Sequence, residues 1–235
     1  MKVNVFLIKC LTNLHVGNGD VNYNIIDQEV EKDPITELPM INSSGVKGAL
    51  KEHCENYLSK DSVNCIFGDK DNSGSYKFLQ ADLLFRPLRV TDEHDKSYVL
   101  ATTEEIISLY EKKVSGLAGI NYKLELSKLD NRILLEDEQA ELGRCDILSD
   151  KEVAVVRSLK YDLPVIARNV LDENGISQNL WYEEFVPHES IFYLIILTPE
   201  EMNPVFKKAI CENPVQFGGN ASIGYGYTRI TEVRL

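Results

Sequence analysis

The strongest candidate for acid–base chemistry is an aspartate in a long irregular stretch of the sequence, residues 13–43. A loop of that length inside a compact domain is usually functional or disordered. Asp27 follows the apolar pair Ile25 and Ile26, so its backbone is expected to be anchored while its carboxylate is presented. Beside a ribose hydroxyl, such a carboxylate could accept a proton or bind a divalent cation opposite a phosphate. A single aspartate on a loop is by default a solvated turn residue, so spacing alone leaves both interpretations open.

A second segment, residues 43–51 (SSGVKGALK), combines a predicted helix start with two lysines. Free amides at a helix start attract phosphate, and Lys47 and Lys51 fall one turn apart on the same helix face. Ser43 or Ser44 is expected to cap this helix. The alternative is a capped helix whose lysines simply face solvent. The run lacks the G-x-x-x-x-G-K-[ST] pattern, which excludes a Walker-type nucleotide site.

A third segment near the end of the chain is rich in glycine. Gly218, Gly219, Gly224 and Gly226 fall within nine positions, and Asn220 lies among them. Such a loop can lay backbone amides along a phosphate backbone, and the neighbouring tyrosines could stack on bases. The alternative is a tight turn that leads into an edge strand.

The net charge of −12 and the pI of about 4.9 argue against a free-standing nucleic-acid binder, which usually has a basic surface. The acids are partly segregated, however. Residues 136–152 carry seven acidic side chains against two basic ones, whereas residues 38–51 carry two lysines and no acid. An acidic chain of this kind can still hold an anion through backbone amides and a few lysines.

The five cysteines and four histidines lack the C-x-x-C and H-x-x-x-H spacings of metal sites. An odd cysteine count indicates free thiols in a reducing compartment, so a cytoplasmic location is expected and a structural zinc site is not. No segment is long and apolar enough to span a membrane, and the first residues do not resemble a secretory signal.

The elements that must position these segments follow from the hydrophobic pattern. Strands are expected at 3–12, 80–90, 97–101 and 191–197 and at the end of the chain, with helices at 44–58, 102–114, 150–159 and 198–211. One hairpin is expected within 120–135, and a second where the sequence DENG joins two strand-like runs. Residues 63–78 are expected to form a loop. In 235 residues with no second core, this order fits an α+β fold with a ferredoxin-like β-α-β-β-α-β core and large insertions.

Taken together, these segments resemble the RAMP backbone subunit of type III-B CRISPR–Cas (Cmr) effector complexes, the subunit that cleaves target RNA. The resemblance rests on LTNLHVGNG, IIDQEVEKDPITELPMINSSGVKGALKEH, NLWYEEFVPHESIFYLIIL and QFGGNASIGYGYTRI. Residues 60–160 match weakly. The serine–lysine run and the glycine loop are shared by RAMP proteins broadly, whereas LWYEE and the DQ of IIDQEVEKDPIT point to the Cmr backbone subunit.

The resemblance implies a single RAMP domain over residues 1–235, with a ferredoxin-like, RRM-related palm. It also implies a long catalytic loop at about 13–43, an insertion at about 60–160 and a β-hairpin thumb at about 168–182. Such subunits form a filament along a guide CRISPR RNA with other Cmr-type subunits. Their thumbs displace nucleotides of the paired target RNA, which is then cut at regular intervals in a metal-dependent reaction.

The family's catalytic aspartate falls on Asp27, which would also hold a divalent metal ion, Mg or Mn. His15, Glu183 and Glu184 are possible helpers, although the two glutamates could equally be solvent-facing strand residues. The resemblance places RNA contacts at Ser43, Ser44, Lys47, Lys51, Arg168, Gly218, Gly219, Asn220, Gly224 and Gly226.

Three alternatives remain open at the level of the sequence. The chain could bind guide RNA as a scaffold without cutting. It could instead be a guide-processing RAMP endonuclease, an enzyme class that typically uses a histidine base, for which His15 is the candidate. The acidic pI favours a third alternative, a structural protein that binds no nucleic acid.

Overall fold

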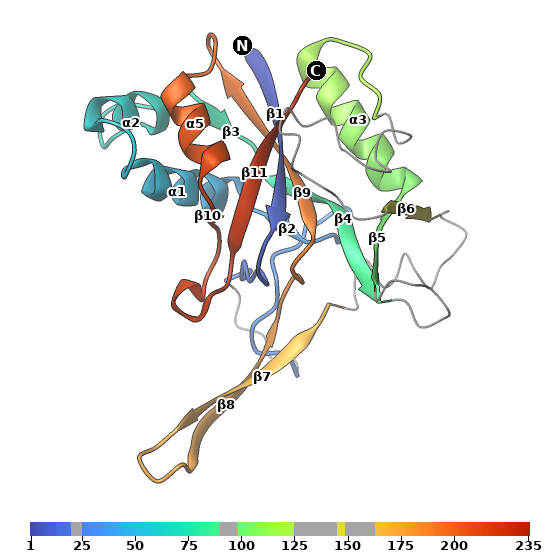
Figure 1. Cartoon of the computed structure of the whole chain (residues 1–235), viewed down its shortest axis with the longest axis vertical. Coiled ribbons are helices and arrows are strands. Elements are labelled where there is room, and N and C mark those ends of the chain that lie inside the picture. The colour runs from blue at the N-terminus through green and yellow to red at the C-terminus, as the bar shows by residue number, and fades with distance from the viewer. Residues whose placement is uncertain (20–24, 90–97, 125–144, 149–162) are drawn as a thin grey trace.

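A computed structural model describes residues 1–19, 25–89, 98–124, 145–148 and 163–235 of the chain. Within these residues, nine strands form one sheet and two further strands form a separate hairpin that projects from the body (Figure 1).

The centre of the sheet has the order β11-β1-β9-β4, and every neighbouring pair is antiparallel. The elements that build it are β1 (Lys2–Cys10), α1 (Ser43–Cys54), β4 (Ala81–Arg89), β9 (Ile191–Thr198), α5 (Pro204–Glu212) and β11 (Tyr227–Val233). This is the strand order of the ferredoxin-like fold, so the predicted α+β palm is confirmed. Because β4 is a palm strand, the expected insertion at 60–160 does not lie wholly outside the palm.

Shorter elements extend the palm. They are β2 (Met40–Ile41), α2 (Lys60–Phe67), β3 (Lys77–Phe78), β5 (Tyr98–Thr103), α3 (Glu104–Ala118), β6 (Cys145–Leu148), β10 (Val215–Gln216) and the 3₁₀ helix η2 (Ala221–Ile223). β5 pairs with β4, and β6 adds a parallel strand to the edge beyond β5.

The core lies on both faces of the sheet, because α1 and α5 pack together on one side and α3 contacts β1 and β4 on the other (Figure 1). Consecutive residues Val5 to Ile8 of β1 are therefore all buried, which is why this strand is almost continuously apolar. Aromatic rings join α2 to α5: Phe67 stacks on Phe78 with centroids 5.0 Å apart, and Phe206 meets Phe67 edge-on.

The predicted loop at 63–78 is wrong at both ends, because its first part forms the end of α2 and its last two residues form β3. Ser59 caps this helix, since its Oγ accepts a hydrogen bond from Ser62 N at 3.3 Å. The helix buries the i, i+3, i+4 set Val63, Ile66 and Phe67. The turn-forming residues that follow it, DKDNSGS, masked this short helical pattern.

The cap of α1 also differs from the prediction. Asn42, rather than Ser43 or Ser44, caps the helix, because its Oδ1 accepts a hydrogen bond from Ser44 N at 3.1 Å. The helix ends at Cys54, before the predicted Leu58. Asn and Ser are comparably good caps, so the choice depended on backbone geometry.

The predicted starts of α3 and α5 are also wrong, because a different residue from the expected one caps each helix. Thr103 caps α3 through a hydrogen bond from Ile106 N at 3.2 Å, whereas Thr102 is buried at the end of β5. Asn203 caps α5, and Pro204 follows at the first helical position. The helix expected to open at residue 198 therefore begins six residues later, where an amide side chain reaches the free N–H groups.

The projecting hairpin consists of β7 (Val165–Leu171) and β8 (Ser177–Glu184), which pair only with each other among the described strands. We call residues 165–184 the thumb. The hairpin predicted at about 168–182 is confirmed and is longer at both ends. The carboxylate of Asp172 accepts hydrogen bonds from Ile176 N and Asn174 N in the turn, which lowers its pKa, and Gly175 takes a φ of 78°.

The helix predicted at 150–159 and most of the hairpin predicted at 120–135 lie outside the described residues. Four cysteines, Cys10, Cys54, Cys65 and Cys211, are free thiols, as expected. Burial raises the pKa of the Cys54 thiol to about 12, so this group stays protonated. None of the helices in the described residues combines the length and apolar character that a bilayer crossing requires.

Candidate functional site

Asp27 lies at the base of the thumb, where the long loop is fastened to β8. Its backbone N–H and that of Gln28 both donate to Tyr182 O, each at 3.1 Å. Gln28 pairs with Glu183 in a parallel bridge, and Glu184 N donates to Gln28 O at 2.9 Å. The loop is therefore attached along the end of β8 by an isolated bridge and its flanking hydrogen bonds.

The carboxylate of Asp27 is held through one oxygen. Tyr182 N donates to Oδ2 at 2.8 Å, while the residue as a whole is exposed. Oδ1 receives no hydrogen bond from the residues that the structure describes. A backbone amide fixes the direction of this carboxylate, and an oxygen is left to accept a proton or to bind a cation.

A divalent metal ion would find one carboxylate here rather than a preformed cage. The described residues contain no group of three or more His, Cys, Asp or Glu side chains that could hold a metal. Mg²⁺ keeps several waters and commonly binds proteins through one or two carboxylates together with substrate phosphates. The single exposed carboxylate of Asp27 fits that mode, in which the substrate completes the site.

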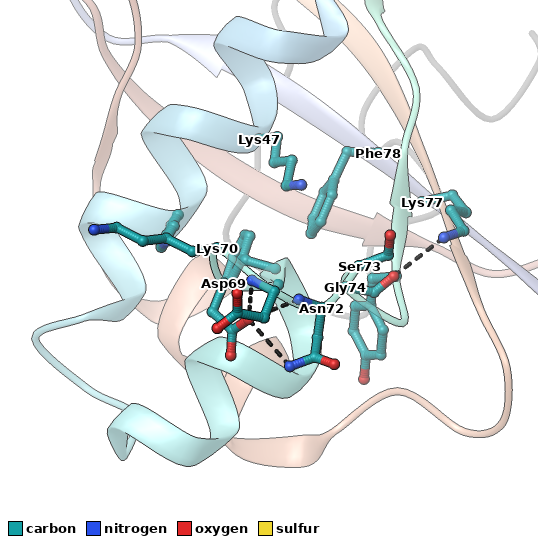
Figure 2. Close-up of a pocket in the computed structure, with 13 residues that line it drawn as sticks. Lys47, Asp69, Lys70, Asn72, Ser73, Gly74, Lys77 and Phe78 are labelled. Atoms are coloured by element: carbon teal, nitrogen blue, oxygen red, sulfur yellow. Dashed lines mark hydrogen bonds between the residues drawn. The ribbon is translucent and has the colours of Figure 1, made fainter.

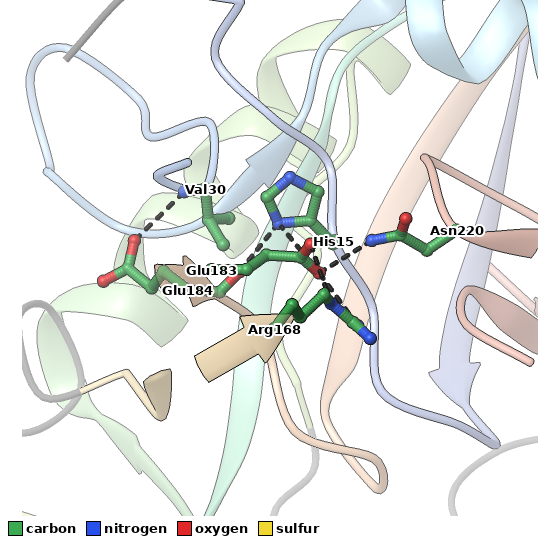
Figure 3. Close-up of polar contacts among 6 residues, drawn as sticks. All are labelled: His15, Val30, Arg168, Glu183, Glu184 and Asn220. Carbon is green, nitrogen blue, oxygen red and sulfur yellow. Dashed lines mark hydrogen bonds and ion pairs between the residues drawn. The ribbon is translucent and has the colours of Figure 1, made fainter. Parts of the chain in front are cut away.

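Glu183, the next residue of β8, is buried and fully engaged (Figure 3). Arg168 donates from Nε to Oε2 at 3.0 Å and from Nη2 to Oε1 at 3.2 Å, and Asn220 Nδ2 donates to Oε1 at 2.7 Å. Partial burial opposes the charge of Arg168, but the hydrogen bonds and charge of Glu183 raise its pKa overall. The alternative of a solvent-facing Glu183 is wrong, because its side chain is 1% exposed.

Glu184 points to the opposite side of the strand, as consecutive strand residues must. Its Oε2 accepts a hydrogen bond from Val30 N at 3.0 Å, and Lys32 Nζ lies 3.4 Å from Oε1. The Glu184 side chain is 3% exposed, so the solvent-facing alternative fails here too. Glu184 therefore joins the long loop to the thumb, whereas Glu183 joins the glycine-rich loop to the thumb.

His15 is buried against the same strand. Its Nδ1 lies 2.7 Å from Glu184 O, and because a carbonyl only accepts, Nδ1 carries the hydrogen. Glu183 Oε1 is 4.0 Å from the same nitrogen. The backbone of His15 also fastens the glycine-rich loop, since its carbonyl accepts a hydrogen bond from Gly219 N at 2.9 Å. His15 therefore holds the end of β8 and the glycine-rich loop in position.

Two of the glycines are required by close backbone contacts. A Cβ at Gly218 would lie 2.2 Å from His15 O, and one at Gly226 would lie 1.9 Å from Phe217 O. Both residues also have positive φ values. At Gly224, by contrast, a Cβ would meet open space. Part of the glycine pattern thus serves packing rather than ligand approach.

The tyrosines near this loop differ in their availability for stacking. The Arg168 guanidinium lies 4.8 Å from the centroid of the Tyr225 ring, and Phe185 meets that ring edge-on. Tyr227 is 40% exposed. Base stacking thus remains a prediction better suited to Tyr227, since one ring face of Tyr225 is already covered.

A groove of about 820 Å³ lies between α1 and the segment that follows α2 (Figure 2). Lys47 and Lys51 line it together with Lys70 and Lys77, two lysines that the sequence analysis missed. We call this the lysine groove. Asp69 also lines it, but hydrogen bonds from the N–H groups of Asp71 and Asn72 turn its carboxylate into the turn and lower its pKa.

Ser43 and Ser44 are exposed at the start of α1. The N–H of Ser44 is already used by the cap, so fewer free amides remain there than the sequence suggested. α1 packs against β10, which leads into the glycine-rich loop. The helix that carries Lys47 and Lys51 therefore contacts the strand that leads into the glycine-rich loop, whereas Arg168 lies apart from them on the thumb.

The family model described as the RAMP superfamily matches residues 7–229. The chain belongs to the RAMP superfamily. The ferredoxin-like palm predicted from the sequence is thus the RAMP palm, with the thumb between its second and third strands.

Individual RAMP proteins are similar to this chain over nearly its whole length. It is 24% identical to the CRISPR system Cmr endoribonuclease Cmr4 of Pyrococcus furiosus, over 98% of this chain and 96% of that protein. A chain in the cryo-EM structure of the type III-B Cmr-beta complex bound to cognate target RNA superposes with a TM-score of 0.75 at 21% identity, covering 99% and 97% of the two chains. Oligomeric Cmr4 from Pyrococcus furiosus superposes with a TM-score of 0.69 at 20% identity, covering 99% and 98%.

In this RAMP chain the fold brings together residues that the sequence could only name separately. His15, Arg168, Glu183, Glu184 and Asn220 form one group at the base of the thumb, which we call the thumb-base cluster (Figure 3).

Sequence reasoning missed the partners of this cluster, namely the backbone of Val30 and the side chains of Lys32 and Tyr225. It also missed the Tyr182 backbone, which holds Asp27. The sequence held no signal for these contacts, because adjacent charged residues at the end of a strand are usually exposed.

Proposed function

We propose that this chain is a backbone subunit of a type III-B RNA-guided effector complex. It binds a guide RNA as a filament of copies and cleaves the paired target RNA at regular intervals. The proposal draws on membership of the RAMP superfamily and on the near full-length similarity to a Cmr endoribonuclease. The observation that carries it is the hydrogen bond from Tyr182 N to Asp27 Oδ2, which aims a carboxylate at the base of a projecting hairpin.

The thumb supplies the geometry for cleavage. Its outer part exposes Leu171, Ile176 and Leu180, which are more than half exposed and suited to contact bases rather than water. Inserted across a guide–target duplex, this hairpin displaces one nucleotide of the target. The displaced ribose can then place its 2′-oxygen in line with the scissile phosphorus, which is a positioning effect.

Asp27 supplies the proton acceptor. Its carboxylate takes the proton from the 2′-hydroxyl as the 2′-oxygen bonds to phosphorus and the bond to the 5′-oxygen breaks. The leaving 5′-oxygen takes a proton from water, so the products are a 2′,3′-cyclic phosphate and a 5′-hydroxyl. A divalent ion, Mg²⁺ or Mn²⁺, held by Asp27 and the target phosphate would supply charge neutralisation.

The guide is held by the lysine groove and the neighbouring loops. Lys47 and Lys51, with Ser43 and Ser44, lie along α1, and the exposed part of the glycine-rich loop contacts the RNA backbone. The net charge of −12 is consistent with this role if many copies share one guide and acidic surfaces face other subunits. The free thiols of the chain support a cytoplasmic location for such an assembly.

The test is a target-cleavage ladder from the reconstituted, guide-loaded complex. Asp27→Ala removes the carboxylate, and Asp27→Asn keeps an oxygen for Tyr182 N while losing the basicity. Both variants should assemble and lose periodic cleavage by about 10²- to 10⁴-fold, the usual contribution of general acid–base groups. Asp61→Asn, an exposed aspartate in the first turn of α2, is the matched control and should cut normally.

Two outcomes would contradict the proposal. A ladder that persists in both Asp27 variants would show that this carboxylate is not the proton acceptor. A wild-type complex that binds target without cutting would identify the chain as a scaffold. Cleavage should also stop with a chelator and return with Mg²⁺ or Mn²⁺, and persistence in the chelator would exclude the metal requirement.

A guide-processing endonuclease is less well supported. Such an enzyme needs an accessible histidine base, whereas His15 is 6% exposed and its Nδ1 is committed to Glu184 O. Incubation with precursor RNA should therefore give no site-specific product. Excess absorbance at 260 nm in the purified complex would count against a structural protein that binds no nucleic acid.

A further inference from the structure

Three consecutive residues of β8 connect three different parts of the molecule, and Figure 3 shows two of them, Glu183 and Glu184. The backbone of Tyr182 holds Asp27, the side chain of Glu183 holds the glycine-rich loop through Asn220, and Glu184 holds the long loop through Val30. The end of this strand is therefore the structural link between the predicted RNA-contact loop and the predicted proton acceptor.

Glu183 is the residue in this link that depends most on its neighbours. Its carboxylate is buried. The two N–H groups of the Arg168 guanidinium and the side-chain amide of Asn220 together stabilise the charge of this carboxylate. Removing a hydrogen-bond partner from a buried charge is costly, because water cannot reach the charge to take the partner's place. A change at Asn220 will therefore move or loosen the Glu183 side chain.

The path from Asn220 to Asp27 is short. Asn220 Nδ2 lies 2.7 Å from Glu183 Oε1, and the adjoining residue, Tyr182, donates its N–H to Asp27 Oδ2 at 2.8 Å. Asn220 has a φ of 62°, which is a left-handed conformation. Its side chain points toward Glu183 only while the glycine-rich loop keeps this backbone conformation. A ligand that orders the glycine-rich loop therefore also orders the end of β8, which holds the Asp27 carboxylate.

We propose that Glu183, with Arg168 and Asn220, is a positioning unit that couples RNA contact at the glycine-rich loop to the direction of the Asp27 carboxylate. The inference rests on the proposed function, since it assigns a second role within the same site. It gives Arg168 an internal role in place of the RNA contact expected from the sequence. It also means that a subunit whose glycine-rich loop contacts no RNA would hold the Asp27 carboxylate less firmly.

The first test measures single-turnover cleavage by the guide-loaded complex at saturating target and metal. Asn220→Gly removes the amide and keeps the left-handed backbone, which glycine adopts freely. Asn220→Asp keeps the side-chain size and places a second carboxylate against Glu183. At saturating target the rate should fall about 10- to 100-fold in Asn220→Gly, as for other misplaced catalytic groups, and further in Asn220→Asp. Asn213→Ala is the matched control, because it removes the hydrogen bond that the Asn213 side-chain amide donates to Ala209 O at the end of α5.

The second test asks whether Asn220 acts through Glu183. If it does, the double variant Asn220→Gly/Glu183→Gln should cleave no more slowly than Glu183→Gln alone, because the two changes break one unit. Losses that multiply would overturn the coupling. Should Glu183→Gln fail to assemble, Arg168→Lys, which keeps the charge and loses the fork, takes its place in the cycle. Glu111→Gln controls for the loss of a buried, hydrogen-bonded carboxylate elsewhere.

A third measurement does not depend on activity. In the guide-loaded complex, hydrogen exchange at the amides of Asp27, Gln28 and Tyr182 should be several-fold faster in Asn220→Gly than in the wild type, with β1 and β9 unchanged. Equal exchange rates, or a wild-type cleavage rate in Asn220→Gly, would overturn the positioning unit while leaving the proposed function intact. Absence of a ladder from the wild-type complex would instead overturn the proposed function.

Discussion

The thumb-base cluster and the lysine groove are both polar, yet they are built in opposite ways. In the cluster, Glu183 and Glu184 are almost fully buried, and each carboxylate has partners at fixed distances. In the groove, Lys47 is exposed, and it is one of several lysines that line an open volume. The cluster therefore acts through geometry, so that one substitution has a large effect, whereas the groove acts through summed charge, so that each lysine contributes a little.

The largest effect is expected from emptying the centre of the cluster. Glu183→Ala leaves Arg168 without its carboxylate and Asn220 without its acceptor, and breaking a buried pair costs about 3–5 kcal/mol. The lower end is expected, because the Arg168 side chain is 18% exposed and can regain some water. Urea denaturation of the purified chain measures the change, and a loss below about 1 kcal/mol would mean that the cluster is not rigidly built.

A smaller effect is expected where the glycine-rich loop passes His15. Gly218→Ala places a Cβ 2.2 Å from a backbone oxygen at a φ of 75°, so it adds a clash to the strain of a left-handed alanine. Gly224→Ala is the matched control, because its φ is 84° and nothing lies near its Cβ. We expect a cost of about 1 kcal/mol for the control, with a clearly larger cost at Gly218. Equal melting temperatures for the two variants would show that the close contact is not maintained in solution.

The smallest effects belong to the lysine groove. Lys47→Ala or Lys70→Ala should each weaken guide-RNA binding by less than about tenfold and lower the slope of log K against log salt by about 0.7, the value for one phosphate contact on a single strand. Binding titrations at several salt concentrations give both quantities. Lys208→Ala, on the exposed side of α5, is the control. A loss of several orders of magnitude from one lysine would mean that the groove, too, is a geometric site.

The parts of the fold that sequence reasoning found are those specified by neighbouring residues. A pattern of β-branched and aromatic residues identified β1, and an unbroken apolar run identified β9. The DENG turn identified the thumb, because turn geometry is decided within four residues. Helix starts were less predictable. Asn42 and Asn203 compete with nearby serines and threonines that cap equally well, and the backbone decides among them.

The candidate site shows the same division. Asp27 could be proposed from the apolar pair that precedes it and from the family resemblance, but its partner Tyr182 lies 155 positions further along the chain. Glu183 and Glu184 carry no signal of burial in their own sequence, because a charged residue at the end of a strand is usually exposed. Their partners come from β7, the glycine-rich loop and the long loop.

The sequence by itself determined the order of the palm elements and the turn of the thumb, and it made Asp27 a candidate proton acceptor. These features depend on residue spacing and on turn chemistry, which act over short stretches of chain. Only the tertiary structure decided that two adjacent glutamates are buried, that His15 is held by a carbonyl and that the glycine-rich loop meets the thumb. A buried charge is tolerated only where distant segments supply its partners, and that supply exists only once the chain has folded.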